Sequence, residues 1–315
     1  MTCMCRLGLG ALVLCSLIPA VPTRAQEMPS RLNAVPFQDV HVEDAFWSPR
    51  IERNRTVTIE ADLRQCERDG HLDNFVFAAG MAPGKHRGLV FNDSDVYKVI
   101  EGAAYTLSSR RDPALEKRID DIIHLIAAAQ QPDGYLDTYY TLVEPQNRWK
   151  NIKGGHELYC AGHLIEAAVA YRNSTGKRQL LDVACKFADH IDSVFGPDKR
   201  HAVSGHPEIE LALLKLYHAT GEKRYLRLAQ FFIDERGHPD GRQLFGEYAQ
   251  DHKPVREQTE VVGHAVRAMY LYCGMADLAA ETGDPQLFQA LENIWHDVVD
   301  RKMYLTGGIG PSAHN

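Results

Sequence analysis

The sequence predicts an all-α protein, an (α/α)6 toroid or barrel truncated to roughly nine helices. Two observations predict this fold class: apolar residues recur with a helical period of about 3.6, and short turns join the helices in pairs. The first helical segment covers residues 51–68, and the complete architecture needs about three more helices than the sequence provides. The other segments are 96–109, 115–131, 157–171, 179–195, 208–218, 225–234, 262–280 and 286–301.

The short turns within the helix pairs resemble one another. Three of the four contain Thr-Gly, at Thr175-Gly176, Thr220-Gly221 and Thr282-Gly283. Glycine supplies the left-handed residue with which many helices end. The spacing of these glycines is uneven but always one hairpin apart, so the pattern indicates a degenerate αα repeat.

Longer loops rich in glycine and histidine separate one helix pair from the next, at 132–155, 196–207 and 237–263. Because loops that are freed from packing can carry binding groups, we expect the functional site at the end of the toroid where these loops gather. Residues 71–94 contain glycines and prolines without a steady period, and we expect another long loop there.

The N-terminal part divides into two segments ahead of the helices. Residues 1–25 read as a signal peptide, because Arg6 precedes an apolar run of about a dozen residues, whereas a membrane span needs about 20. Residues 26–50 form an N-terminal arm with one short strand at Val40–Val42, and residues 51–315 form the incomplete (α/α)6 barrel. We therefore expect a secreted or periplasmic protein.

The composition and net charge of the chain argue against two classes of binding partner. The chain has 315 residues, of which 44% are hydrophobic and 24% charged, and a formal net charge of -7. An acidic balance argues against nucleic acid and anionic membrane surfaces as partners.

The cysteines beyond the signal peptide are widely separated and show no CxxC spacing, so they are interpreted mainly as small buried residues: Cys66, Cys160, Cys185 and Cys273.

Three histidines occupy equivalent places in successive hairpins. His156, His206 and His264 each follow a glycine at the start of a helix expected in the inner ring. Repetition of the same Gly-His step predicts that the three rings converge on one cavity, where neutral imidazoles can donate and accept hydrogen bonds to sugar hydroxyls. The alternative is that each histidine is satisfied by backbone carbonyls.

Other polar residues beside the same loops are assigned to the rim of this pocket: Tyr135, Asp137, Glu157 and Glu208. Glycoside hydrolysis commonly uses two carboxylates about 5–10 Å apart, but spacing alone selects no pair here. His156, Cys160 and His163 share one helical face, yet the two histidines lie about 10 Å apart along the axis. A packed Cys160 is therefore preferred to a metal ligand, and no metal ligands are expected in this chain.

Several ordered motifs follow one another along the chain: GHELY with AGHLIEAA at 155–168, GHPEIELAL at 205–213, VGHAVRAMY at 262–270 and TGGIG at 306–310. In this order they resemble glycoside hydrolase family 127, the β-L-arabinofuranosidase family. The resemblance runs from about Phe46 to the last residue.

The resemblance implies an (α/α)6 catalytic barrel followed by β-sandwich domains, which together hydrolyse a terminal furanoside with retention. It also implies that His156, His206 and His264 contact the sugar. The family's acid/base is a glutamate shortly after the Gly-Gly-Ile-Gly stretch, and its nucleophile is a cysteine of a zinc site that uses further cysteines and a glutamate.

No residue of this chain matches those catalytic groups, which are expected after Asn315. We therefore expect no catalytic residues in this chain. On this interpretation the chain is an inactive N-terminal portion that holds no zinc, whereas the full-length member would hold zinc.

The expected partner is a carbohydrate, an arabinofuranoside or related glycan, with no nucleic acid and no membrane. Self-association through the exposed, truncated face of the barrel is also expected. Two rival functions share the helical architecture. A lyase or unsaturated-uronide hydrolase would use local carboxylates such as Asp137, Glu157 or Glu208, whereas a non-catalytic sugar-binding helical repeat would bind without turnover.

Overall fold

The computed structural model describes residues 35–310, and this part of the chain is built from helices with no strand or sheet. The predicted signal peptide, residues 26–34 of the predicted arm and residues 311–315 lie outside the described residues. None of the described helices combines the length and apolar character needed to cross a membrane. The helices are α1 Trp47–Arg53, α2 Ile59–Arg68, α3 His71–Ala78, α4 Asp93–Ser109, α5 Pro113–Ala129, α6 Thr138–Leu142, α7 Glu157–Thr175, α8 Gln179–Val194, α9 Ile209–Thr220, α10 Lys223–Glu235, α11 Ala265–Thr282 and α12 Pro285–Asp297.

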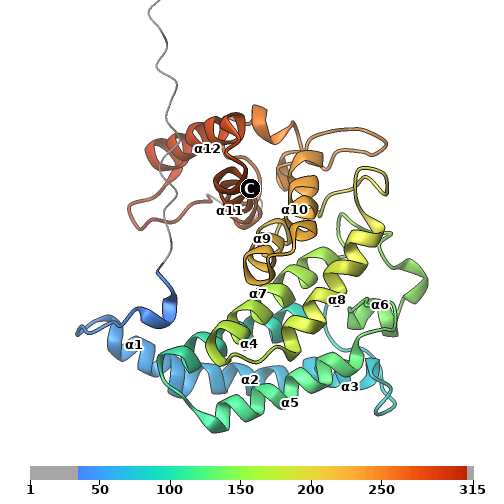
Figure 1. The fold of residues 1–315 in the computed structure, drawn as a ribbon, viewed down its shortest axis with the longest axis vertical. Coiled ribbons are helices and arrows are strands. Elements are labelled where there is room, and N and C mark those ends of the chain that lie inside the picture. Colours follow the sequence, from blue (N-terminus) through green and yellow to red (C-terminus); the bar gives the residue numbers. More distant parts are fainter. Residues whose placement is uncertain (1–34, 311–315) are drawn as a thin grey trace, which may run out of the picture. The chain divides into compact units, whose positions relative to one another are not determined.

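Four helical hairpins follow one another along the chain: α4–α5, α7–α8, α9–α10 and α11–α12 (Figure 1). The first helices of successive hairpins lie side by side, with α7 between α4 and α9, and α9 between α7 and α11. The second helices form the other layer, in which α5 contacts α8 and α8 contacts α10. This alternation of inner and outer helices confirms the predicted all-α toroid.

The hairpin turns follow from local sequence. Gly176, Gly221 and Gly283 close α7, α9 and α11 in the left-handed conformation, with φ of 76°, 74° and 69°. Asp112 and Asp284 begin the outer helices α5 and α12, because each carboxylate accepts two backbone N–H groups of the first turn ahead of a proline. The predicted left-handed glycines are confirmed, and the aspartate caps are an additional feature of the turns.

The inner helix α7 is buried on almost every side, and its buried residues include polar as well as apolar side chains. Residues from Glu157 to Tyr171 are nearly all buried, because α4, α8 and α9 all pack against this helix. A helix buried on all sides cannot show a single apolar stripe. Its polar side chains therefore face the interior of the protein, where they must find partners or a ligand.

Two predictions about the N-terminal half are wrong. Residues 71–78, expected in a loop, form α3, which begins after Gly70 and buries Phe75, while the Asn74 amide bonds to the backbone N–H and carbonyl of Arg87. With α3 the described residues contain ten helices of at least eight residues, one more than predicted. The short strand expected at Val40–Val42 is absent from the described residues, because both valines are exposed and no neighbouring strand supplies a ladder of hydrogen bonds.

Candidate functional site

The three histidines of the Gly-His steps converge. The ring centroid of His206 lies 6.0 Å from that of His156 and 5.9 Å from that of His264. His156 precedes α7, His264 precedes α11, and His206 lies in the loop before α9, so neighbouring inner helices bring the rings together. The three half-buried rings are called the histidine cluster below.

Close backbone packing requires the glycine of the Gly205-His206 step. A side chain on Gly205 would overlap the backbone carbonyl of Lys153, and Gly205 also donates its N–H to the Ile152 carbonyl at 3.1 Å. The loop that carries His156 and the loop that carries His206 therefore cross in backbone contact, which only glycine allows. This crossing holds the two rings near each other.

His156 itself adopts a left-handed backbone with φ of 59° and ψ of 13°, which is uncommon for a residue with a side chain. Its ring lies 5.0 Å from the ring of Phe91 and 5.6 Å from that of Tyr159. An unfavourable backbone that is held by its surroundings is a feature of functional positions. It directs the imidazole of His156 toward His206.

Backbone partners fix the tautomers of the cluster. Nδ1 of His156 lies 2.7 Å from the Gly154 carbonyl, and Nδ1 of His206 lies 2.9 Å from the Pro207 carbonyl. Because a carbonyl only accepts, both Nδ1 atoms carry the proton and both Nε2 atoms are acceptors. Nδ1 of His264 instead accepts the N–H of Arg267 at 3.4 Å, which leaves its Nε2–H as a donor.

The cluster is uncharged near neutral pH. Burial lowers the pKa of His156 and His264, and it lowers the pKa of His206 to about 3. The Arg267 guanidinium lowers the pKa of each of the three further. Neutral rings present two acceptors and one donor in a small space, the combination that suits the hydroxyl groups of a sugar.

Residues that sequence reasoning did not assign complete this surface. The Tyr159 ring lies 4.5 Å from His206, and its hydroxyl accepts a hydrogen bond from Lys98 Nζ at 2.7 Å. The Tyr270 ring lies 5.8 Å from His206. Both tyrosines occur in the motifs that carry the histidines, so position within the motif was the available signal. Lys98 lies on α4, and nothing in its local sequence indicates the contact.

The residues expected on a pocket rim are instead buried. Tyr135 and Asp137 are 0% and 1% exposed, and Glu157 is 2% exposed. Glu157 accepts the Tyr135 hydroxyl at 2.6 Å and the Trp149 N–H at 2.8 Å, so it ties the loop before α7 to the helix. The Asp137 carboxylate accepts the Tyr140 N–H at 2.9 Å as the cap of α6. These groups support the loops and do not line a rim.

Glu208 is also buried, with 0% exposure, although it directly precedes α9. Its Oε1 lies 3.4 Å from Nδ1 of His163, one of the polar groups inside the helical layer. Burial, followed by the negative charge of Glu166, raises the pKa of Glu208. Glu208 is predicted on the pocket rim, but its side chain is fully buried, so this assignment is corrected.

The helical face shared by His156, Cys160 and His163 does not form a metal site. Cys160 is buried, its Sγ lies 3.7 Å from the Phe91 carbonyl, and burial raises the pKa of the thiol. Within residues 35–310, the group of potential metal ligands that lie close enough together contains no cysteine. The preference for a packed Cys160 agrees with this placement.

The catalytic groups are expected after Asn315, which is the last residue of the given sequence. Asn315 and the four residues before it lie outside the described residues, and the described part ends at Gly310 in the Gly-Gly-Ile-Gly stretch. The position of the acid/base and nucleophile therefore stays a prediction. The residues that the structure does describe supply the histidine cluster.

Comparison with known proteins decides the family. Residues 39–315 match the family described as Beta-L-arabinofuranosidase, GH127 catalytic domain. The chain belongs to this family. The resemblance in the ordered histidine motifs is thereby confirmed, and the GH127 catalytic domain accounts for the toroid of helical hairpins.

Similar proteins agree on the GH127 assignment. The chain is 45% identical over 265 residues to a non-reducing end beta-L-arabinofuranosidase of Bifidobacterium longum subsp. longum, a match that covers 76% of this chain and 40% of that protein. A GH127 beta-L-arabinofuranosidase from Geobacillus stearothermophilus T6 superposes with a TM-score of 0.84 at 48% identity, covering 88% of this chain and 47% of that one. A second solved GH127 beta-arabinofuranosidase gives a TM-score of 0.83 at 47% identity, covering 88% and 45%. This GH127 chain therefore spans less than half the length of each of these relatives.

Proposed function

We propose that this chain forms the sugar-binding part of a glycosidase that removes terminal β-L-arabinofuranosyl groups from plant-type glycans. The convergence of His156, His206 and His264, with His206 about 6 Å from each of the other two rings, carries the proposal. The GH127 assignment supplies the reaction class, and the activity for which the relatives are named supports the furanoside as substrate.

The proposed contacts follow from the tautomers. Nε2 of His156 and Nε2 of His206 accept hydrogen bonds from sugar hydroxyls, and Nε2–H of His264 donates one. The faces of Tyr159 and Tyr270 beside His206 offer apolar surface to the C–H groups of the ring. A small polyhydroxylated ring is the ligand that satisfies both kinds of contact.

The bond-breaking groups implied by the GH127 resemblance do not fit residues of this chain. The implied zinc site uses cysteines, whereas Cys66 and Cys160 are buried and Cys185 and Cys273 lie outside the close group of potential ligands in the described residues. No catalytic step is therefore assigned to this chain through zinc. We expect the 315-residue chain to bind the sugar without turning it over.

Calorimetry with methyl β-L-arabinofuranoside tests this proposal on the chain as it stands. We expect saturable binding that His206→Ala weakens by at least about tenfold, because a lost hydrogen bond in a buried site costs about 1.5 kcal/mol or more. His201→Ala is the matched control, since the His201 ring contacts Glu235 and Phe231 and is not a member of the cluster. Equal loss in both variants, or no binding by the folded chain, would contradict the proposal.

The rival lyase or unsaturated-uronide hydrolase has less support. It needs accessible carboxylates, but Asp137, Glu157 and Glu208 are all at least 98% buried. Turnover by the chain that disappears on substitution of one of these residues would favour the rival. A non-catalytic sugar-binding helical repeat would also bind the sugar saturably without turnover. Turnover by a longer GH127 protein that contains these residues would distinguish the glycosidase from such a repeat.

Two further proposals concern the setting of the protein. Export to the periplasm or the medium is supported by the sequence of residues 1–25. Self-association is supported by exposed side chains on inner helices, among them Tyr105 on α4 and Val266 on α11, which are 43% and 50% exposed. Cell fractionation tests the first, and sedimentation velocity tests the second.

A further inference from the structure

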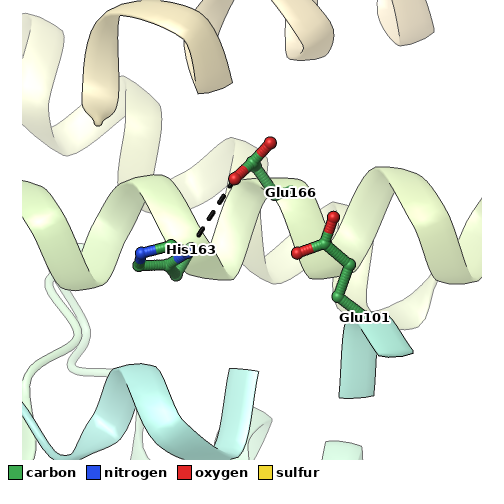
Figure 2. Close-up of side chains that lie close together, drawn as sticks. All are labelled: Glu101, His163 and Glu166. Atoms are coloured by element: carbon green, nitrogen blue, oxygen red, sulfur yellow. Dashed lines mark ion pairs between the residues drawn. The ribbon is translucent and has the colours of Figure 1, made fainter. Parts of the chain in front are cut away.

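Two inner helices bring three potential metal ligands together inside the helical layer. Glu101 lies on α4, and His163 and Glu166 lie one turn apart on α7. One donor atom from each residue lies within 4.8 Å of the other two. Figure 2 shows the His163 ring and the Glu166 carboxylate next to each other, with the Glu101 carboxylate on the neighbouring helix extending toward Glu166.

His163 is the member of this group that points to a ligand. It is only 3% exposed, yet neither of its ring nitrogens has a hydrogen-bond partner among the described residues. Its Nδ1 lies 3.8 Å from Glu166 Oε2 and 3.4 Å from Glu208 Oε1. Buried polar atoms are nearly always satisfied, because leaving one unpaired costs about 1–3 kcal/mol.

The carboxylates around His163 are only partly neutralised. Lys215 pairs with Oε1 of Glu166, which leaves Oε2 facing His163, and Glu101 accepts the Tyr105 hydroxyl at 2.9 Å. Burial and then the charge of Glu166 raise the pKa of Glu101. Carboxylate oxygens of Glu101, Glu166 and Glu208 therefore lie around His163, and a bound cation would give them a partner.

The imidazole is in the state that binds metal. Burial lowers the pKa of His163 to about 2, and the ammonium groups of Lys98 and Lys215 lower it further, so the ring is neutral and keeps a lone pair. A neutral imidazole with carboxylates is a donor set that zinc and similar divalent metals accept. A hard cation such as Mg²⁺ or Ca²⁺ would prefer oxygen ligands alone.

We propose that Glu101, His163 and Glu166 bind one divalent cation of the zinc class. Zinc–ligand distances of about 2.0–2.2 Å require the three donor atoms to approach one another by about 1 Å, which rotation of the half-buried Glu101 side chain can supply. Water or the Glu208 carboxylate completes the coordination. The proposal replaces the expectation that this chain binds no metal, and it depends on neither the histidine cluster nor the cysteine-containing zinc site implied by the family.

Zinc binding to the metal-stripped chain tests the proposal. The chain is dialysed against EDTA and then titrated with Zn²⁺ by calorimetry, and Co²⁺ is added separately to record its visible absorption. We expect one equivalent of Zn²⁺ per chain. His163→Gln abolishes this binding, Glu101→Gln weakens it by at least about tenfold, and both variants change the Co²⁺ spectrum.

His296→Gln is the matched control, because His296 also faces a carboxylate, Asp300 at 3.1 Å, but is exposed on another part of the chain. It should keep the full stoichiometry. If His163→Gln does not fold, as judged by circular dichroism, Glu101→Gln decides, since that side chain is only half-buried. Absence of zinc binding by the folded chain, or zinc binding that His163→Gln and Glu101→Gln both leave unchanged, overturns the proposal. Metal content is the readout, so either result leaves the sugar-binding test independent.

Discussion

Substitution of Arg236 should strongly destabilise the end of the fold that carries the histidine cluster. Arg236 follows α10 and is 0% exposed. Its guanidinium donates to Glu210 at 2.8 Å, to the Ser204 carbonyl at 3.0 Å and to the Ala249 carbonyl at 2.9 Å. Because Ser204 lies two residues before His206, this one side chain connects α9 and α10 to the loop of the cluster.

The loss of stability in Arg236→Met can be estimated from the groups that lose their hydrogen-bond donor. Glu210 is also 0% exposed, and breaking a buried ion pair by removing one partner costs about 3–5 kcal/mol. The two carbonyls lose donors worth about 1 kcal/mol each, although they can relax. We therefore expect a loss of about 4–6 kcal/mol in the free energy of unfolding, a large part of the 5–15 kcal/mol typical of a domain.

Urea unfolding followed by far-ultraviolet circular dichroism measures this loss. The double variant Arg236→Met with Glu210→Leu should recover part of it, because no unpaired charge then remains buried. A loss below about 1 kcal/mol for Arg236→Met, or a double variant as unstable as the sum of the two single variants, would refute the reasoning.

Three further perturbations have defined outcomes. Gly205→Ala should weaken both stability and sugar binding, because its side chain overlaps the Lys153 carbonyl, whereas Gly221→Ala, with open space around it, should cost only about 1 kcal/mol in urea unfolding and leave calorimetric binding intact. Burial raises the pKa of Glu157 to about 7, so the native state holds a proton that the unfolded chain has released between about pH 4.5 and 7. The contribution of Glu157 to stability should therefore fall by up to about 3 kcal/mol as the pH rises through that window, so the difference in the free energy of unfolding between the native chain and Glu157→Gln should change by this amount between urea titrations at pH 5 and pH 8. Asp112→Ala removes the cap of α5 and should cost about 1 kcal/mol by thermal unfolding; no change would show that the two backbone N–H groups are satisfied without it.

The repeated parts of the fold were accessible from the sequence. Periodicity and the Thr-Gly turns identified the four hairpins, because three of the inner helices end at a left-handed glycine before the chain reverses. The Gly-His step predicted that the three rings meet, since equivalent positions in a repeat lie at the same end of neighbouring helices. Helix α3 was missed because eight residues with a buried Asn74 give no clear apolar stripe.

The burial of individual side chains, and the contacts between residues far apart in the sequence, could not be predicted from the sequence. The sequence places Glu208 beside a long loop, but it does not show that the side chain is fully buried before α9. Glu101 and His163 lie on different helices, and only the packing of α4 against α7 brings them together. The same limit applies to Lys98 and Tyr159, whose hydrogen bond joins residues 61 positions apart.

Nitrogen-15 NMR of the histidine rings, recorded while methyl β-L-arabinofuranoside is added, tests the central claim most directly. We predict that the Nε2 signals of His156, His206 and His264 shift together with one saturation curve, while the His201 signals stay unchanged. Ring signals that do not respond to the sugar, or that respond at His201 as strongly as in the cluster, would contradict it.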